Sequence, residues 1–485
     1  MKYDAFGRIT SVIKPGDDLE LPTLEFEYET AAPLSTIKTR VRERSGEPGT
    51  LDKVVLVDGL GRERASFSEG SQAGKWILSG YSRFDARGNS SFTAYASETT
   101  STSLPAADTE LLGTTSSHDA LGRVTSVRHP DGAEARTDYS PLQRTVWDEN
   151  DTDSASPHAG TPTTYLSDGL DRLVSVVERE AGHEIVTGEY SYIASGSLEK
   201  VTDALGRVRS YEYDGRSRRT RIEDPDAGIW TMSYTDGNDL ESRLDPDGAQ
   251  VSFAYDALGR VIEEWHRDAI GDEHLAAEFY YDDPSKAHPD LFNTLGQLAW
   301  VRDEAGTKYF SYDERGRTTD EIRRWSDGTE HAIWTDYDAQ DRVIRRGFPD
   351  GSHLELKYDR RGLVSEIGPL AKEFRWAAHG GMLSVLLGNG VTDKHGYDER
   401  QRLTSMVAKN ADGAVLRGLA LTLDRASRIT DVTESASSGT SEREPFRTFS
   451  IRRPVPIAKG RIRGRRDHVG ARCTRERDRC REHLR

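Results

Sequence analysis

The chain has 485 residues, a formal net charge of −16, 35% hydrophobic residues and 31% charged residues. Compact globular domains usually hold more hydrophobic and fewer charged residues, so this composition excludes a thick apolar core. The acidic charge disfavours nucleic-acid binding by most of the chain, and no apolar run approaches the length of a membrane span.

One phrase recurs from the first residues onward: an aromatic or polar residue, Asp, two variable residues, Gly, Arg and an aliphatic residue. Its purest copy is residues 255–261, Tyr-Asp-Ala-Leu-Gly-Arg-Val. Alternating polar and apolar residues flank the copies, which is typical of half-buried β-strands. The phrase therefore predicts a protein built from one repeated unit.

Each copy predicts a β-hairpin corner. Asp at the first turn position accepts hydrogen bonds from backbone amides two residues on, and Gly supplies the positive φ that closes the loop. The aromatic ring covers the corner, and we expect the Arg to reach a carboxylate or carbonyl of a neighbouring corner. The candidate site residues are thus structural corner residues: Tyr3, Asp4, Gly7, Arg8, Asp58, Gly61, Arg62, Asp119, Gly122, Arg123, Asp203, Gly206, Arg207, Tyr255, Asp256, Gly259, Arg260, Tyr312, Asp313, Gly316, Arg317, Tyr337, Asp338, Arg342, Tyr358, Asp359, Gly362, Tyr397, Asp398 and Arg402.

A second kind of turn, containing Pro-Asp-Gly, falls between the corners at residues 129–132, 245–248 and 348–351. Where the pattern is cleanest, Asp338 and Asp359 are 21 residues apart, which is enough for two strands and two turns. One repeat therefore corresponds to one hairpin. Because stacked repeats leave unpaired edges, we also expect the chain to associate or aggregate.

The chain divides into four predicted parts. Residues 1–110 form a less regular β region that leads into the repeats, and residues 111–434 form the repeat β-sheet, with an irregular interruption at 267–300. Residues 435–450 are a small-residue linker, and 451–485 are a basic tail.

The repeated Tyr-Asp phrase resembles that of the RHS/YD-repeat family, which includes polymorphic bacterial toxins, the B and C components of insecticidal toxin complexes, and the teneurins. Copies run from residue 3 to about residue 430. The resemblance implies an all-β fold in which repeated antiparallel hairpins form part of a curved, spiralling shell around a C-terminal toxic domain. It implies a secreted or cell-surface parent protein of bacterial origin. The partners it implies are the remainder of that shell and its effector domain, a toxin-complex component or a cell-surface glycan.

The tail differs in charge from the rest of the chain. Residues 451–485 hold 13 Lys and Arg against 4 Asp and Glu, and both cysteines, Cys473 and Cys480. Three interpretations remain open: a nucleic-acid or cargo-binding segment, a disordered basic end, and the product of a frameshift. We favour the third interpretation. Residues 451–456 can be encoded by a set of codons that, when read one base later, encodes Tyr-Asp-Ala-Leu-Tyr.

The start of the chain shows no signal peptide, because Met1 and Lys2 lead directly into the first corner. We expect an N-terminal part of the parent protein to be missing. Residues 1–450 contain no cysteine, which excludes a disulfide framework there.

No catalytic, metal or cofactor site is predicted. The Asp-Pro-Asp strings at Asp224 and Asp245 resemble the family's self-cleavage junction, but turn chemistry explains them better. The acidic residues 235–239 lack the complete spacing of a calcium loop, and Cys473, Cys480 and His483 are too few for a zinc site. No Gly-x-Ser-x-Gly or His-Glu-x-x-His motif is present.

The leading functional hypothesis is a structural shell segment that scaffolds or encapsulates a C-terminal effector without catalysis of its own. The alternative is a carbohydrate- or receptor-binding surface module, motivated by Trp265, Trp300, Trp325 and Trp334 near turns. We favour the interpretation that these rings cover strand corners. An autoproteolytic enzyme is the third hypothesis.

Overall fold

A computed structural model gives the fold of residues 1–106, 110–180, 183–282, 288, 291–435 and 446–450. The predicted tail, with Cys473, Cys480 and His483, lies outside the described residues, as does most of the predicted linker. Apart from one short helix, α1 (Glu149–Thr152), the regular structure of the described residues is β-strand. Among these residues no helix is long and apolar enough to cross a membrane.

The strands form two antiparallel sheets. The smaller has eight strands in the order β1 (Lys2–Tyr3), β2 (Ile9–Val12), β3 (Leu24–Glu29), β4 (Leu34–Arg42), β5 (Thr50–Asp58), β6 (Glu63–Glu69), β7 (Trp76–Ser79) and β10 (Ser97–Thr99). The larger begins with β8 (Ser82–Phe84), β9 (Ser90–Ala94), β11 (Gly113–His118), β12 (Val124–Arg128), β13 (Glu134–Ser140), β14 (Gln143–Trp147), β15 (Thr163–Ser167), β16 (Leu173–Glu180), β17 (His183–Tyr192), β18 (Leu198–Asp203), β19 (Val208–Tyr213) and β20 (Arg219–Asp224).

The larger sheet continues, each strand pairing with the next, through β21 (Gly228–Tyr234), β22 (Leu240–Leu244), β23 (Gln250–Tyr255), β24 (Val261–Arg267), β25 (Glu273–Tyr281), β26 (Leu298–Asp303), β27 (Gly306–Tyr312), β28 (Thr318–Trp325), β29 (Glu330–Tyr337), β30 (Val343–Gly347), β31 (His353–Tyr358), β32 (Val364–Ile367), β33 (Ala371–Trp376), β34 (Met382–Leu387), β35 (Thr392–Tyr397), β36 (Leu403–Lys409), β37 (Val415–Leu423), β38 (Ile429–Ser435) and β39 (Phe446–Ser450).

The predicted interruption at residues 267–300 is wrong for most of its length. β25 lies inside it and pairs with both β24 and β26. The departure from the repeat is confined to the connection between Tyr281 and Leu298, where the chain inserts extra residues into one corner. Ser435 ends β38, and residues 446–450 of the predicted linker form β39, which pairs with β38.

The pairing register shifts by one residue next to the corner tyrosines. In β23 the shift falls between Ala254 and Tyr255, and the same irregularity precedes Tyr312, Tyr358 and Tyr397. A bulge of this kind increases the local twist and bend of a strand. Repetition at successive corners therefore favours a strip of sheet that curls.

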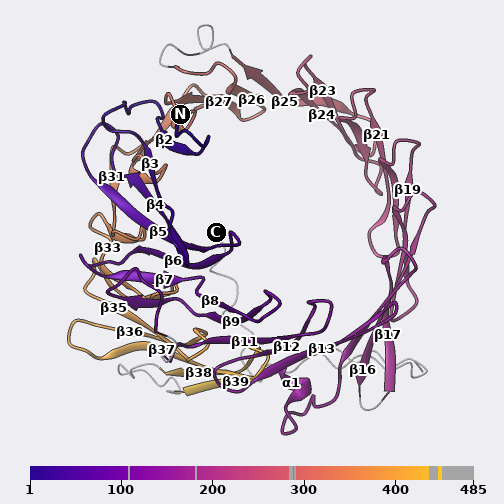
Figure 1. The fold of residues 1–485 in the computed structure, drawn as a ribbon. Coiled ribbons are helices and arrows are strands. Elements are labelled where there is room, and N and C mark those ends of the chain that lie inside the picture. Colours follow the sequence, from indigo (N-terminus) through magenta and orange to yellow (C-terminus); the bar gives the residue numbers. More distant parts are fainter. Residues whose placement is uncertain (107–109, 181–182, 283–287, 289–290, 436–445, 451–485) are drawn as a thin grey trace.

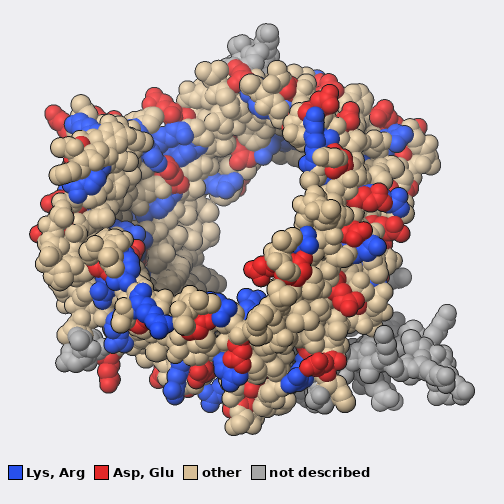
Figure 2. Space-filling view, turned by 45° about the vertical axis from the view of Figure 1, so that its right-hand side comes forward, with Lys and Arg blue, Asp and Glu red and all other residues tan. Residues whose placement is uncertain are grey.

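The strip curls into a ring that overlaps itself (Figure 1). The indigo strands β2–β7 and the orange strands β31–β37 lie on the same side of the ring, and β17–β21 lie opposite them. The space-filling view shows an open passage through the ring and mixed acidic and basic residues over its surface (Figure 2). The all-β spiralling fold that the sequence predicts is confirmed.

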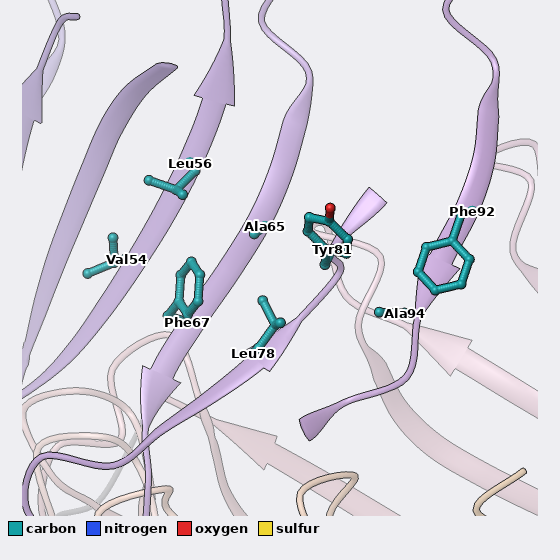
Figure 3. Close-up of a cluster of buried hydrophobic side chains, with 8 residues drawn as sticks. All are labelled: Val54, Leu56, Ala65, Phe67, Leu78, Tyr81, Phe92 and Ala94. Carbon is teal, nitrogen blue, oxygen red and sulfur yellow. The ribbon is translucent and has the colours of Figure 1, made fainter. Parts of the chain in front are cut away.

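The main apolar cluster lies where the small sheet meets the start of the large one. Phe67 and Ala65 of β6 are fully buried, and they pack with Leu78 of β7 and with side chains of β5 and β9 (Figure 3). Most other strand residues are only half-buried. The low hydrophobic content thus matches a thin sheet with one local core.

Candidate functional site: corners and seam

A hydrogen-bond network folds each corner, and the copy at residues 255–260 shows it in full. Asp256 Oδ1 accepts the backbone N–H groups of Leu258 (2.9 Å) and Arg260 (3.0 Å), and Oδ2 accepts Nε of Arg260 at 2.7 Å. Gly259 has a φ of 77°, in the region that glycine adopts without steric cost. One carboxylate therefore holds both the backbone and the arginine.

This network lowers the pKa of Asp256 below its ordinary value. The backbone N–H of Arg260 is the largest cause, and the Arg260 guanidinium and the N–H of Leu258 add to it, against the opposing effect of burial. A carboxylate with a lowered pKa stays ionised at neutral pH and keeps its pairing with arginine.

The pairing of Asp with an Arg four residues later recurs at many corners. The distance between Asp Oδ2 and Arg Nε is 2.6 to 2.9 Å at each of these pairs: Asp4–Arg8, Asp58–Arg62, Asp119–Arg123, Asp168–Arg172, Asp203–Arg207, Asp214–Arg218, Asp256–Arg260, Asp313–Arg317, Asp338–Arg342 and Asp398–Arg402. Asp359 differs, because Leu363 follows it at this spacing and Arg361 pairs with it instead.

The corner at residues 337–342 is linked to its neighbours on both sides. The Tyr337 hydroxyl donates to the carbonyl of Thr318, just after the preceding corner (2.9 Å), and the Arg317 guanidinium stacks over the Tyr337 ring, 4.8 Å from its centroid. The Tyr358 hydroxyl in turn donates to the Val343 carbonyl at 2.6 Å. Tyr255, Tyr312 and Tyr397 donate in the same way to the carbonyls of Leu240, Leu298 and Met382.

The corners form a ladder along one edge of the strip, because every second connection of an antiparallel sheet lies at the same edge. We call this the corner edge, and we call the opposite edge, which carries most of the Pro-Asp-Gly turns, the turn edge. Tyr3 stands apart from the ladder, since its hydroxyl lies near Met1 Sδ (3.6 Å).

Asp203 and Arg207 lie at the turn edge, although their phrase copies that of Asp256 and Arg260. Their turn joins β18 to β19, whereas the flanking turns, at residues 193–197 and 214–218, are at the corner edge. Thr202 stands where the corner-edge copies have an aromatic residue. The Asp-x-x-Gly-Arg spacing thus folds a corner at either edge.

Three corners that the motif search missed carry the same Asp with serine or aspartate in place of glycine. Asp171, Ser217 and Ser427 occupy the glycine position with φ of 61 to 66°. The Asp-to-Arg spacing of four residues, at Asp168, Asp214 and Asp424, is the signal that would have found them.

The corner edge of residues 312–428 lies against the turn edge of residues 14–153, and we call this contact the seam. Arg315 and Asp17 form a buried ion pair in it. The Arg315 side chain is 6% exposed, and its guanidinium contacts Asp17 (3.0 Å), Ser45 Oγ (2.6 Å) and the Pro15 carbonyl (2.9 Å). The Asp17 side chain is 0% exposed.

Four further seam pairs repeat this polarity, with arginines at the corner edge and carboxylates at the turn edge: Arg360–Glu69, Arg400–Glu149, Arg425–Asp153 and Arg428–Asp148. Two contacts place the carboxylate at the corner edge instead, Lys14–Asp341 and Asn150–Asp424, and Gln401 donates to the Ala96 carbonyl. Partners are separated by 251 to 327 residues in the sequence. The strip therefore meets itself after one circuit.

At two seam corners the glycine position holds another residue, and the side chain of that residue makes a contact across the seam. Asp341 and Gln401 have φ of 63° and 61°, which costs a non-glycine residue about 1 kcal/mol. Asp341 pairs across the seam with Lys14, and Gln401 donates to Ala96. Seam contacts offset this strain.

The acidic strings considered for cleavage or calcium binding form turns. Asp224 Oδ1 accepts the backbone N–H groups of Asp226 and Ala227 at 2.8 and 2.9 Å. Residues 235–239 form a hairpin corner, with the N–H of Thr235 donating to the Asp239 carbonyl. Within the described part of the chain, no three His, Cys, Asp or Glu residues are grouped as metal ligands would be.

The fold defines a class: a spiralling β-shell segment held by Asp-Arg corners. The Teneurin YD-shell family model matches residues 247–442, and the RHS Repeat model matches residues 194–229. Residues 194–229 and 247–442 are therefore similar to RHS/YD-repeat shell proteins.

Related proteins are much longer than this chain. The toxin protein Tse5 of Pseudomonas aeruginosa is 27% identical over 202 residues, which are 40% of this chain and 13% of Tse5. The crystal structure of TcdB2-TccC3 has a TM-score of 0.80 at 17% identity and covers 90% of this chain and 27% of that one. The Photorhabdus luminescens Tc holotoxin pore structure has a TM-score of 0.72 at 17% identity, covering 84% and 23%. The chain thus spans under a third of the length of these relatives.

Proposed function

We propose that this chain is a structural segment of a toxin-type shell, which scaffolds and, in the full protein, encloses a C-terminal effector. The observation that carries the proposal is the seam. Because the strip meets itself after one circuit, it surrounds a space rather than forming an open sheet (Figure 2). The likeness in fold to TcdB2-TccC3 and the similarity to Tse5 support it.

In this proposal the chain performs no catalysis itself. The recurring carboxylates are each bound to an arginine and to backbone N–H groups, and the pKa of Asp256 and of Asp313 is lowered. A general acid or base works best with a pKa near the working pH. The corner aspartates are held away from that range and serve to fold turns.

Enclosure can be tested by asking whether the shell protects a fused peptide from a protease. A flexible peptide with a single protease site is fused after Ser450 in place of the tail, and its cleavage rate is compared with that of the same peptide on an unrelated soluble domain. We expect at least severalfold slower cleavage on the shell chain, and recovery of the faster rate in an Arg315→Ala/Arg400→Ala variant whose seam is weakened. Equal rates in all three proteins would refute enclosure.

The alternative is a glycan-binding surface that includes tryptophans near turns. Trp325 is 42% exposed, and Tyr280, which stacks on Trp300, is 36% exposed. Their surroundings argue against it. Tyr280 is stacked on Trp300 with centroids 3.5 Å apart, and Trp325 Nε1 donates to His331. Trp265 Nε1 donates to Glu263. The rings are engaged by neighbours on their own strands or across strands.

A glycan array distinguishes the two functions. The shell proposal expects no glycan signal that depends on these rings. A glycan bound by the whole chain and lost on Trp300→Ala and Trp325→Ala, with the fold retained by circular dichroism, would establish the alternative.

A further inference from the structure

The third residue of each corner, two positions after the Asp, differs between the two circuits of the corner edge. At three of the seam corners this position holds Arg315, Arg361 and Arg400, each with 6% of its side chain exposed. In the first circuit, residues 4–297, six corners hold a large apolar residue at this position, and each is at least 75% exposed: Phe6, Leu60, Leu121, Leu170, Leu258 and Leu295. Two other corners of this circuit hold Arg87 and Arg216. The edge thus carries arginines at three seam corners, and it carries exposed large apolar residues at six corners of the first circuit.

These apolar side chains gather in one stretch of the edge. The corners of Leu121 and Leu170 are separated by a single connection at the same edge, which carries Leu142, itself 56% exposed. Corners at one edge follow every second strand, so neighbouring leucines are roughly 10 Å apart. Leu121, Leu142 and Leu170 therefore form a row, which we call the leucine row.

A row of this kind differs from scattered surface leucines. Single exposed apolar residues are normal, whereas aligned ones mark an interaction surface. The seam shows that a neighbouring turn of shell covers this same edge further along the chain, so the edge is shaped for coverage. An apolar row needs an apolar partner, and the carboxylates that line the seam's other side do not provide one.

We propose that the first-circuit corner edge is a docking surface for a second copy of this chain, which presents the same edge. Two such edges meet as apolar against apolar. The contact is isologous, which is the commonest arrangement in soluble oligomers. The spiral is no obstacle, because a two-fold axis perpendicular to the ring axis maps a spiral edge onto itself.

The exposed leucines supply more than half of the area that a stable pair needs. Five exposed leucines (Leu60, Leu121, Leu142, Leu170 and Leu258) each offer roughly 100 Å² of apolar surface. With the polar atoms of the intervening corners, this approaches the roughly 800 Å² per partner of a standard interface. The dimer would join two rings edge to edge and lengthen the space they surround.

Sedimentation of the whole chain at 1 to 50 μM tests the proposal. We expect a dimer that persists in 1 M NaCl, since apolar contacts are not screened by salt. The Leu121→Glu/Leu142→Glu/Leu170→Glu variant should be monomeric across this range, which corresponds to at least a 50-fold weaker association.

Ile270→Glu is the matched control, because Ile270 is 86% exposed but lies at the turn edge. It should dimerise like the parent chain. A monomeric parent chain would overturn the proposal, as would a dimer that survives the triple substitution or is lost in the Ile270 variant. Circular dichroism and seam hydrogen exchange matching the parent show that the triple variant is folded, and Leu121→Met/Leu142→Met/Leu170→Met, which keeps the row apolar, should remain dimeric.

Discussion

Replacing Arg315 with alanine should open the seam. The substitution leaves the Asp17 carboxylate, whose side chain is 0% exposed, without its guanidinium, and it also removes contacts to Ser45, Pro15 and Ala339. Removing one member of a buried ion pair costs about 3 to 5 kcal/mol. We take about 3 kcal/mol, the low end, because Asp17 keeps its hydrogen bonds from Thr23 and Gly46.

Hydrogen exchange is the appropriate assay, since a chain of stacked repeats need not unfold in one step and seam opening is a local event. A loss of about 3 kcal/mol raises the population of the open seam, and so the exchange rate, about 100-fold. We expect this increase in peptides covering residues 13–23 and 42–50. Peptides from β19–β21, on the other side of the ring, should be unchanged.

Arg216→Ala is the matched control for this experiment. Arg216 occupies the same third position in its corner, but it is exposed and contacts only the neighbouring corner, at Asp236 and Asn238. It should leave exchange at residues 13–23 and 42–50 unaltered. Equal effects of the two substitutions, or faster exchange spread evenly around the ring in Arg315→Ala, would show that the seam does not hold the circuit together.

Four other measurements test the account of the fold. Acid should open the seam, because the pKa of Asp17 lies below 3.8 in the folded chain: burial is the largest influence and raises the pKa, but Thr23, Gly46 and Arg315 together outweigh it. The stability that Asp17 contributes to the seam is therefore complete above pH 3.8 and is lost as the pH falls through the lowered pKa. Ring dimensions from small-angle scattering should be constant down to about pH 4 and should expand below it. Tyr255→Phe removes the hydrogen bond to the Leu240 carbonyl and should destabilise that hairpin by about 1 kcal/mol, seen as faster exchange in β22–β24 only. Phe67→Ala empties a fully buried position and should cost about 3 to 5 kcal/mol, measured by urea-dependent exchange in β5–β7. Because Asp224 is engaged as a turn, the purified chain should run as a single intact band, and two fragments ending near this residue would restore the autoproteolytic hypothesis.

Glycine proved a weaker sequence signal than the Asp-to-Arg spacing. Asp341 and Gln401 adopt the left-handed conformation without it, and so do Asp171, Ser217 and Ser427. The corners of Asp168, Asp214 and Asp424 were not among the predicted ones, although the same Asp-to-Arg spacing marks them. The carboxylate that binds two backbone N–H groups is the constant part, because it satisfies the turn whichever residue occupies the glycine position.

The sequence by itself determined the β class and a repeated unit of one hairpin. These follow from local chemistry: strand alternation acts over a few residues, and an Asp folds the four residues that follow it. The predicted reach of the arginine to a neighbouring corner also holds, as the Arg317 contacts with Asp338 and Tyr337 show. Each of these interactions connects residues no more than about two strands apart.

Only the tertiary structure decided which edge each corner occupies and which corners meet. Whether Asp203 lies at the corner edge or the turn edge depends on the number of strands between its turn and the neighbouring corners. The sequence of the corner itself does not contain that number. Arg315 meets Asp17 because small bends at successive corners add up over a circuit of some 300 residues. Corners with the same Asp-to-Arg spacing therefore lie in a buried seam in one circuit and at an exposed edge in the other, since the accumulated curl of the strip brings a partner to one and not to the other.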